Sequence, residues 1–367
     1  MKVALVHDYL YQYGGAERVL AALHRLFPDA PVYTTIADPE LVASLLPTAE
    51  IRTSWMQRLP ALRRHHRKYF MFYPSAVEQW DLSAFDLVVS NSSAFGKGVR
   101  TRPDACHVCY CHTPMRFGWE FARYAAREEW RAPTRLLLRP LVEHVRRWDV
   151  RTARRPTGYL ANSTAGARKI ARCYGANAAV VHPPVEVDRF CPAPTTDDFH
   201  LVVARLVGYK RVDLAVEAFN RLGRPLVVIG DGPARASLER IAAPHIRFLG
   251  RVSDAEVARH YARCRALIIP GEEDFGLTPL EANAAGRPAI AFGAGGALDT
   301  VQHGVTGMLF PEQTTAALAA AVTASDAIAW NTDRLRSHAG GFSEARFRER
   351  MTGAIDAVLS RVRPLSA

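Results

Sequence analysis

Acidic and turn-forming residues are concentrated in the segment that runs from Pro270 to Glu281. Glu272, Glu273 and Asp274 precede a predicted helix, and Glu281 lies inside it. Carboxylates accept hydrogen bonds from sugar and ribose hydroxyls, while free backbone amides at the start of a helix bind phosphate oxygens. The residues that would supply or surround these amides are Phe275, Gly276, Leu277 and Thr278. The segment therefore has the chemistry needed to hold a sugar nucleotide.

The same segment has a purely structural interpretation. Thr278 could be the N-cap of the helix, with Pro279 as its first residue and Glu281 as its third. Glu281 would then bond back to the cap amide in a capping box. The two interpretations assign Glu281 different partners, so the fold decides between them.

A pair of basic residues follows a predicted strand in the middle of the chain. Arg205 and Lys210 are separated by a short loop that leads into a predicted helix. Fixed cations in such a loop can stabilise the negative charge of a departing nucleoside diphosphate without a divalent metal. Taken alone, they are best interpreted as an ordinary loop pair.

Two further loops could contribute to a site. Gly14 and Gly15 follow the first predicted strand, where they form a turn or let backbone amides approach a phosphate. His112 is expected to emerge at the end of a strand that also carries Cys106, Cys109 and Cys111. Zinc is the alternative interpretation of this cluster, but neighbouring residues of a strand point to opposite faces. The G-x-G-x-x-G and P-loop patterns are absent.

The elements that must position these residues alternate between short apolar runs and segments of helical period, a pattern typical of parallel α/β layers. The predicted strands of the first half are Lys2–His7, Val32–Ile36, Asp86–Asn91, His107–His112, Thr157–Asn162 and Ala179–Pro183. Those of the second half are His200–Arg205, Pro225–Gly230, Ile246–Gly250, Ala266–Pro270, Pro288–Phe292 and Gly307–Phe310. Each half is expected to form its own doubly wound sheet.

A proline-rich connector at His182–Pro194 separates the two halves. We expect one domain at residues 1–188 and a second at residues 189–342, with a cleft between them of the kind that binds nucleotides. Residues 343–367 are expected to form an amphipathic helix that crosses back to the first domain.

Length and composition agree with this organisation. The chain has 367 residues, too many for one ordinary core, and 49% are hydrophobic and 23% charged, as in globular proteins. The apolar start is too short for a signal peptide, and no apolar run is long enough to cross a membrane. Six sparse cysteines are interpreted as reduced thiols, which favours a cytoplasmic protein.

The formal net charge is +11, and part of the excess lies between Ile51 and Phe70, which contain no acidic residue. A solvated basic face is the simplest interpretation. Because an aromatic segment follows directly, a more specific interpretation is contact with anionic lipid or acceptor at the inner face of the membrane. Contact with nucleic acid is the third interpretation. The basic residues assigned to this face are Arg63, Arg64, Arg67 and Lys68.

The segment from Glu273 to Glu281 resembles the E-x7-E signature of retaining glycosyltransferase family 4. Arg205 and Lys210 match the arginine and lysine that hold the donor diphosphate in that family, with Ala204 in place of the usual glycine. The phrase His112-Thr-Pro-Met-Arg116 resembles the branch of O-antigen mannosyltransferases of the WbaZ type, and the likeness extends to Ala161-Asn-Ser163 and His182-Pro-Pro-Val185.

The resemblance implies the GT-B fold and a retaining, metal-independent hexosyltransferase with no cofactor. It implies that Glu273 orients the transferred sugar, with a covalent role left open, and that His112 lies near sugar and acceptor. We expect the base beside Arg251 and Val252, and the ribose on Glu281. GDP-mannose is the leading donor and UDP-hexoses are next; the acceptor would be lipid-linked or a polysaccharide.

Two other classes of function remain open, because a fold does not by itself name a reaction. A nucleotide-sugar epimerase would use the same architecture without an acceptor. A non-catalytic nucleotide or nucleic-acid binder would use the positive charge, although no nucleic-acid reading motif is present.

Overall fold

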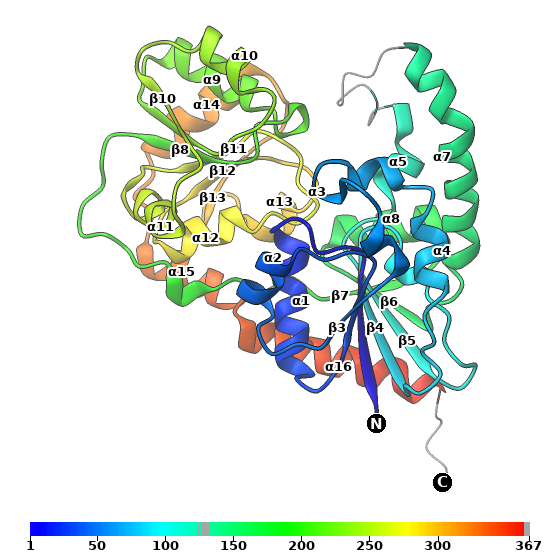
Figure 1. The fold of residues 1–367 in the computed structure, drawn as a ribbon. Coiled ribbons are helices and arrows are strands. Elements are labelled where there is room, and N and C mark those ends of the chain that lie inside the picture. The colour runs from blue at the N-terminus through cyan, green and yellow to red at the C-terminus, as the bar shows by residue number, and fades with distance from the viewer. Residues whose placement is uncertain (123–124, 126–131, 363–367) are drawn as a thin grey trace. The chain divides into compact units, whose positions relative to one another are not determined.

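The computed structural model describes residues 1–122, 125 and 132–362 (Figure 1). The chain divides into two compact units. Unit 1 contains Met1–Pro184 together with Phe347–Ala367, and unit 2 contains Val185–Arg346. The division falls within the proline-rich connector. None of the described helices is both long enough and apolar enough to span a bilayer.

Unit 1 is built on a parallel seven-stranded sheet of order β3-β2-β1-β4-β5-β6-β7. Its strands are β1 (Val3–His7), β2 (Val32–Thr34), β3 (Ile51–Thr53), β4 (Leu87–Ser92), β5 (Cys106–Cys111), β6 (Gly158–Ala161) and β7 (Ala178–Val180). Its main helices are α1 (Gly15–Leu26), α2 (Pro39–Leu45), α3 (Leu62–His65), α4 (Tyr73–Glu78), α5 (Arg116–Trp119), α7 (Ala132–Thr152) and α8 (Thr164–Tyr174).

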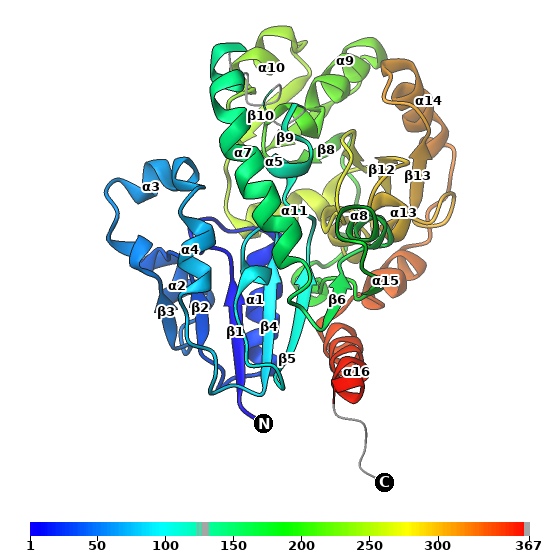
Figure 2. The same cartoon turned by 90° about the vertical axis from the view of Figure 1, so that its right-hand side faces the viewer.

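Both faces of this sheet are covered, which explains why its central strands are continuous apolar runs. In β1, Leu5 packs with residues of α1 and of the last helix, α16 (Glu344–Val362), whereas Ala4 and Val6 pack on the other face with residues of α4 and α7 (Figures 1 and 2). The sequence predicted all of these strands except β3. That strand is a short edge element whose only strongly apolar residue is Ile51, so it carries almost no pattern.

The last helix, α16, lies within residues 343–367, where a helix was predicted. Its buried residues Phe347, Met351, Ile355 and Val358 belong to the core of unit 1. A Cβ on Gly158 in β6 would lie 2.6 Å from Val358 Cγ2, so glycine is needed there for the helix to approach the strand.

Unit 2 is built on a parallel six-stranded sheet of order β10-β9-β8-β11-β12-β13. Its strands are β8 (His200–Val203), β9 (Leu226–Ile229), β10 (Ile246–Gly250), β11 (Leu267–Ile269), β12 (Ala289–Phe292) and β13 (Gly307–Phe310). Its helices are α9 (Val212–Leu222), α10 (Arg235–Ile241), α11 (Asp254–Arg263), α12 (Thr278–Ala284), α13 (Ala297–Thr300), α14 (Thr315–Asp326) and α15 (Thr332–Gly340). All six strands were predicted.

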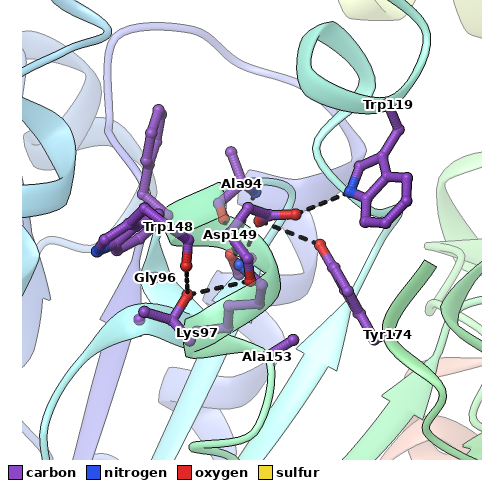
Figure 3. Close-up of polar contacts among 12 residues, drawn as sticks. Ala94, Gly96, Lys97, Trp119, Trp148, Asp149, Ala153 and Tyr174 are labelled. Atoms are coloured by element: carbon purple, nitrogen blue, oxygen red, sulfur yellow. Dashed lines mark hydrogen bonds and ion pairs between the residues drawn. The ribbon is translucent and has the colours of Figure 1, made fainter. Parts of the chain in front are cut away.

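A buried ion pair joins several segments of unit 1 (Figure 3). Lys97 Nζ contacts the carboxylate of Asp149 on α7, and neither side chain is more than 2% exposed. Asp149 also accepts hydrogen bonds from the indole of Trp119 at 2.8 Å and the hydroxyl of Tyr174 at 3.2 Å (Figure 3). One carboxylate therefore holds α5, α7, α8 and the loop after β4 together.

Candidate functional site

The residues assigned to the donor lie at the carboxyl edge of the unit 2 sheet. The strand order changes direction between β8 and β11, because β9 and β10 extend the sheet on one side and β12 and β13 extend it on the other. In open parallel sheets, ligands bind where the loops after two such strands diverge. Arg205 and Lys210 follow β8, and Glu273 follows β11.

The loop after β8 presents two cations around one aromatic ring. Arg205 Nη2 donates a hydrogen bond to the hydroxyl of Tyr209 at 2.6 Å. Lys210 Nζ lies 5.3 Å from the centre of the same ring, within the range of a cation–π contact. Tyr209 thus spaces and orients the two cations. This role was not predicted from the sequence, in which the only signal is an aromatic residue directly before the lysine.

Lys210 and Glu273 form an ion pair between the loops after β8 and β11. Their side chains are 17% and 18% exposed, so both charges are largely shielded yet reach the surface. A Cβ on Gly271 would lie 2.7 Å from Tyr209 O and 2.8 Å from Lys210 Cα. Only glycine allows the backbones of the two loops to approach this closely, which makes Gly271 a second residue that sequence analysis missed.

A third loop, after β12, contacts the backbone of Glu273. Gly296 N donates a hydrogen bond to Glu273 O at 2.8 Å. Gly295 has a φ of 62°, and a Cβ there would lie 2.2 Å from Glu273 O. The backbone of the E-x7-E segment is therefore fixed by neighbouring loops before any ligand binds, and Gly295 and Gly296 were not predicted.

The start of α12 differs from the structural alternative considered for the sequence. The helix begins at Thr278, its N-cap is Leu277, and no side chain caps it. The capping-box interpretation is wrong, because Glu281 Oε2 instead accepts a hydrogen bond from the hydroxyl of Tyr261 at 2.9 Å. Glu281 is only 6% exposed, much less than Glu273. The two glutamates of the motif therefore lie in different environments.

The turn between the two glutamates is shaped by one buried ring and one glycine. Phe275 is 4% exposed and packs with Val185 and Leu280. Gly276 has a φ of 85°, in the left-handed region that favours glycine, and brings the backbone into α12. These residues direct the amides of the helix start, where phosphate oxygens would be stabilised.

Arg251 and Val252 follow β10, at the outer edge of the sheet. Arg251 is exposed and Val252 is half-buried against the core of unit 2. The next residue, Ser253, caps α11 in a capping box with Glu256. This capping box fixes the loop after β10, and β10 lies two strands away from β8 in the sheet.

In unit 1 the strand order changes direction between β1 and β4, and Asp8 connects the loops that follow them. Its buried carboxylate accepts hydrogen bonds from the backbone amides of Ser93, Ala94, Phe95 and Gly96 and from the hydroxyl of Ser92, at 2.6–3.0 Å. Sequence analysis did not single out this residue.

His112 ends a chain of buried polar contacts at the same edge. Its Nε2 lies 2.6 Å from Asn91 Oδ1, and the Nδ2 of Asn91 lies 3.0 Å from His7 Nδ1. His7 Nε2 in turn lies 3.6 Å from Glu17. Burial, followed by the charge on His7, lowers the pKa of His112 to about 3. His112 is therefore neutral at physiological pH, and donation from Nε2 to Asn91 leaves Nδ1 as an acceptor for a hydroxyl.

His7 has the opposite shift. Burial alone would lower its pKa, but the hydrogen bond and charge of Glu17, with the charge of Asp8 and a bond to Asn91 O, raise it above the ordinary value. His7 therefore takes up a proton more readily than an ordinary histidine, and it lies beside His112, which takes one up less readily. His7, Glu17 and Asn91 were not assigned roles from the sequence.

The glycine pair lies at the start of α1. Gly14 is its N-cap in an extended conformation, φ −165°, and Gly15 is the first residue of the helix and exposed. A Cβ on Gly14 would lie 3.2 Å from Glu17 Oε2. The start of this helix is thus open at the same sheet edge as His112.

The basic face is less uniformly positive than its sequence indicated. Arg63 Nη2 lies 3.3 Å from Asp38 and 3.5 Å from Glu40, so the fold supplies the acids that the segment lacks. Arg67 contacts Gln12 at 3.4 Å, and Lys68 is exposed. Arg64 lies in α3, but its side chain is outside the described residues.

The cysteines of β5 are buried in the sheet, and His107 Nε2 between them contacts Ser90 Oγ at 2.8 Å. Within the described part of the chain, no group of three His, Cys, Asp or Glu residues could hold a metal ion.

Comparison with known proteins agrees with the geometry of both units. Residues 13–189 match the model of Glycosyltransferase Family 4, and residues 199–325 match that of Glycosyl transferases group 1. The solved structure of HepE from Anabaena in complex with UDP-glucose has a TM-score of 0.71 at 18% identity, covering 97% of this chain and 100% of its own. The chain belongs to glycosyltransferase family 4 and has the GT-B fold.

Curated relatives match over part of the chain. A GDP-mannose-dependent alpha-(1-6)-phosphatidylinositol monomannoside mannosyltransferase of Mycobacterium tuberculosis is 32% identical over 38% of this chain and 45% of its own length. The O-antigen chain mannosyltransferase C of Escherichia coli is 29% identical over 42% of this chain and 43% of its own. The match thus spans less than half of either relative.

Proposed function

We propose that this protein is a retaining glycosyltransferase that transfers a hexose from a nucleotide sugar to a lipid-linked or polysaccharide acceptor. The observation that carries the proposal is the ion pair of Lys210 with Glu273 at the point where the unit 2 sheet changes direction. It places a cation suited to a diphosphate against a carboxylate suited to sugar hydroxyls.

In this mechanism the donor diphosphate lies between Arg205, Lys210 and the amides at the start of α12. Both cations are positioned before the ligand arrives, so they stabilise the leaving diphosphate at little reorganisation cost. Glu273 orients the transferred sugar, and the leaving diphosphate accepts the proton of the acceptor hydroxyl on the same face. We propose that no divalent metal takes part.

Glu281 would accept a hydrogen bond from the ribose. Its contact with Tyr261 supports this role, because a tyrosine hydroxyl that donates to one oxygen fixes the orientation of the carboxylate. The base would lie beside Arg251 and Val252. His112 and the Gly14-Gly15 turn would contribute from unit 1.

GDP-mannose is the proposed donor. The names of the mannosyltransferase relatives support it, one of them at 32% identity and described as GDP-mannose-dependent. A UDP-sugar is the second candidate, since the similar HepE structure contains UDP-glucose. Acceptor and membrane contact are assigned to Arg63, Arg64, Arg67 and Lys68, at the cytoplasmic face of the inner membrane. Exposed Trp55 and Phe72, with ring centres 5.7 Å apart, support an interfacial role for this region.

The test is transfer from GDP-mannose and UDP-glucose by the Glu273→Gln and Lys210→Ala variants. We expect kcat/KM to fall by about 10²–10³ in each, as for loss of one group that stabilises developing charge. Lys2→Ala, exposed at the opposite end of the unit 1 sheet, is the matched control and should retain activity.

Full turnover of either variant at saturating donor would overturn the assignment. Thermal stabilisation by each nucleotide sugar decides the base, because a ligand that binds only the folded state raises its melting temperature. Conversion of the donor to an epimer without any acceptor would instead identify an epimerase.

A further inference from the structure

Helix α7 of unit 1 has two halves with different surroundings. Its second half is anchored by a buried stripe of helical spacing, made of Val142, Val145, Trp148, Asp149 and Thr152. From Pro133 to Leu141, by contrast, every residue is exposed except the half-buried Leu138. Figures 1 and 2 show the start of α7 extending beyond α4 and α5 of the same unit.

The exposed half contains three consecutive leucines between two arginines. Leu136 and Leu137 are each 73% exposed, and Leu138 follows them. Successive residues of an α-helix are about 100° apart, so these three leucines cover about 200° around the axis, and the two flanking arginines occupy the remaining arc. Leu138 and the 40%-exposed Leu141 continue the buried stripe, but Leu136 points to the opposite side. An apolar arc of this width is broader than the stripe that a surface helix needs for packing on its own core.

Positive charge borders these leucines and continues along the helix. Arg135 and Arg139 flank the three leucines directly, and Arg147 and Arg151 follow on the exposed surface. Of the two acidic residues of α7, Asp149 is buried against Lys97, so Glu143 is the only one that reaches the solvent. Long arginine side chains can place their charge in a headgroup layer while their stems cover apolar surface.

We propose that the first half of α7 docks on an anionic membrane, with Leu136 and Leu137 inserted at the headgroup boundary and Arg135 and Arg139 on lipid phosphates. This rests on the proposed function in one respect, that the acceptor is lipid-linked. A second copy of the chain is the less favourable occupant, since its own α7 would bring the same positive charge. The surface is distinct from the basic face at residues 63–68.

The test is co-sedimentation of the full chain with phosphatidylcholine vesicles that contain phosphatidylglycerol. Leu136→Gln/Leu137→Gln should bind at least about tenfold more weakly than the unmodified chain, because two apolar side chains no longer leave water. Leu298→Gln is the matched control: Leu298 is 51% exposed in unit 2, and its loss should leave binding unchanged. Arg135→Gln/Arg139→Gln should weaken binding to these vesicles but not the weaker binding to pure phosphatidylcholine.

Equal vesicle binding by the leucine variant and the unmodified chain would overturn the proposal. So would a dimer, seen by light scattering, that the leucine variant abolishes, because a second copy would then be the occupant. The readout is independent of catalysis. If the chain binds vesicles through these leucines but transfers no sugar, the docking surface is supported and the proposed function is overturned. If the chain transfers sugar to a soluble acceptor but the leucine variant binds vesicles as well as the unmodified chain does, the proposed function is supported and the docking surface is overturned.

Discussion

Asn91 Oδ1 lies 2.6 Å from Nε2 of His112, and this contact fixes which nitrogen of the imidazole carries the proton. The amide nitrogen of Asn91 is committed elsewhere, because it donates to Ala16 O at 2.8 Å. Its oxygen must therefore face His112 and accept from it. Asn91 thus acts as a positioning residue that presents Nδ1 of His112 as a hydrogen-bond acceptor.

Replacing Asn91 with aspartate should raise the pKa of His112 from about 3. A carboxylate within hydrogen-bond distance favours the imidazolium, typically by about one to three pH units. The measurement is an NMR titration of the histidine Cε1 protons, with a His112→Gln variant to assign the resonance. Asn220→Asp in unit 2 is the control and should leave the titration unchanged. An unaltered His112 pKa in Asn91→Asp would contradict the contact.

Gly271→Ala should lower the stability of unit 2 by about 1–3 kcal/mol, the usual cost of forcing a group into closely packed structure. The added Cβ would meet backbone atoms of Tyr209 and Lys210, which cannot rotate away. Calorimetric unfolding measures this loss. Gly208→Ala in the neighbouring loop is the matched control, because a Cβ there meets nothing within 4 Å. Equal melting of the two variants would show that the loops do not approach this closely.

The buried pair of Lys97 and Asp149 should behave as a strongly coupled unit. Lys97→Met leaves a buried carboxylate without its cation and should cost about 3–5 kcal/mol. Asp149→Asn, which can still accept from Trp119, should restore much of this loss when combined with Lys97→Met. Urea unfolding of both single variants and the double variant gives the coupling energy. Strictly additive losses would argue against the ion pair.

Acidification should destabilise the fold through its buried neutral histidines. Burial, with the charges of Arg155 and Lys97, lowers the pKa of His107 to about 3, against an ordinary value of 6.5. Below pH 6.5 the unfolded chain binds a proton that the folded chain excludes. The free energy of unfolding therefore decreases by about 1.4 kcal/mol for each unit by which the pH is lowered, until the pH approaches 3.

Calorimetry at pH 7.5 and 5.5 of the unmodified chain and of His107→Gln tests this sign. The variant should lose less stability on acidification, although it is less stable at pH 7.5 without the contact to Ser90. His7 works in the opposite direction, because its raised pKa adds stability at low pH that is lost as pH rises. An unchanged pH dependence in His107→Gln would mean that the group titrates normally.

Much of the fold could be predicted from local pattern. Apolar runs such as Leu226–Ile229 are buried on both faces, and such strands carry their own signal in the sequence. The edge strand Ile51–Thr53 lacks that signal and was missed. The capping box considered for the start of α12 does not form, because Glu281 has a tertiary partner, Tyr261, that competes with the local cap.

The sequence by itself determined the two α/β halves, the family and the types of charge available for a nucleotide sugar. Only the tertiary structure decided which charges meet. Lys210 reaches Glu273 because β8 and β11 are neighbours in the sheet although β9 and β10 lie between them in the chain. Gly271, Asp8 and Asn91 act through such long-range proximity, which depends on strand order and close packing and leaves no periodic trace in the sequence.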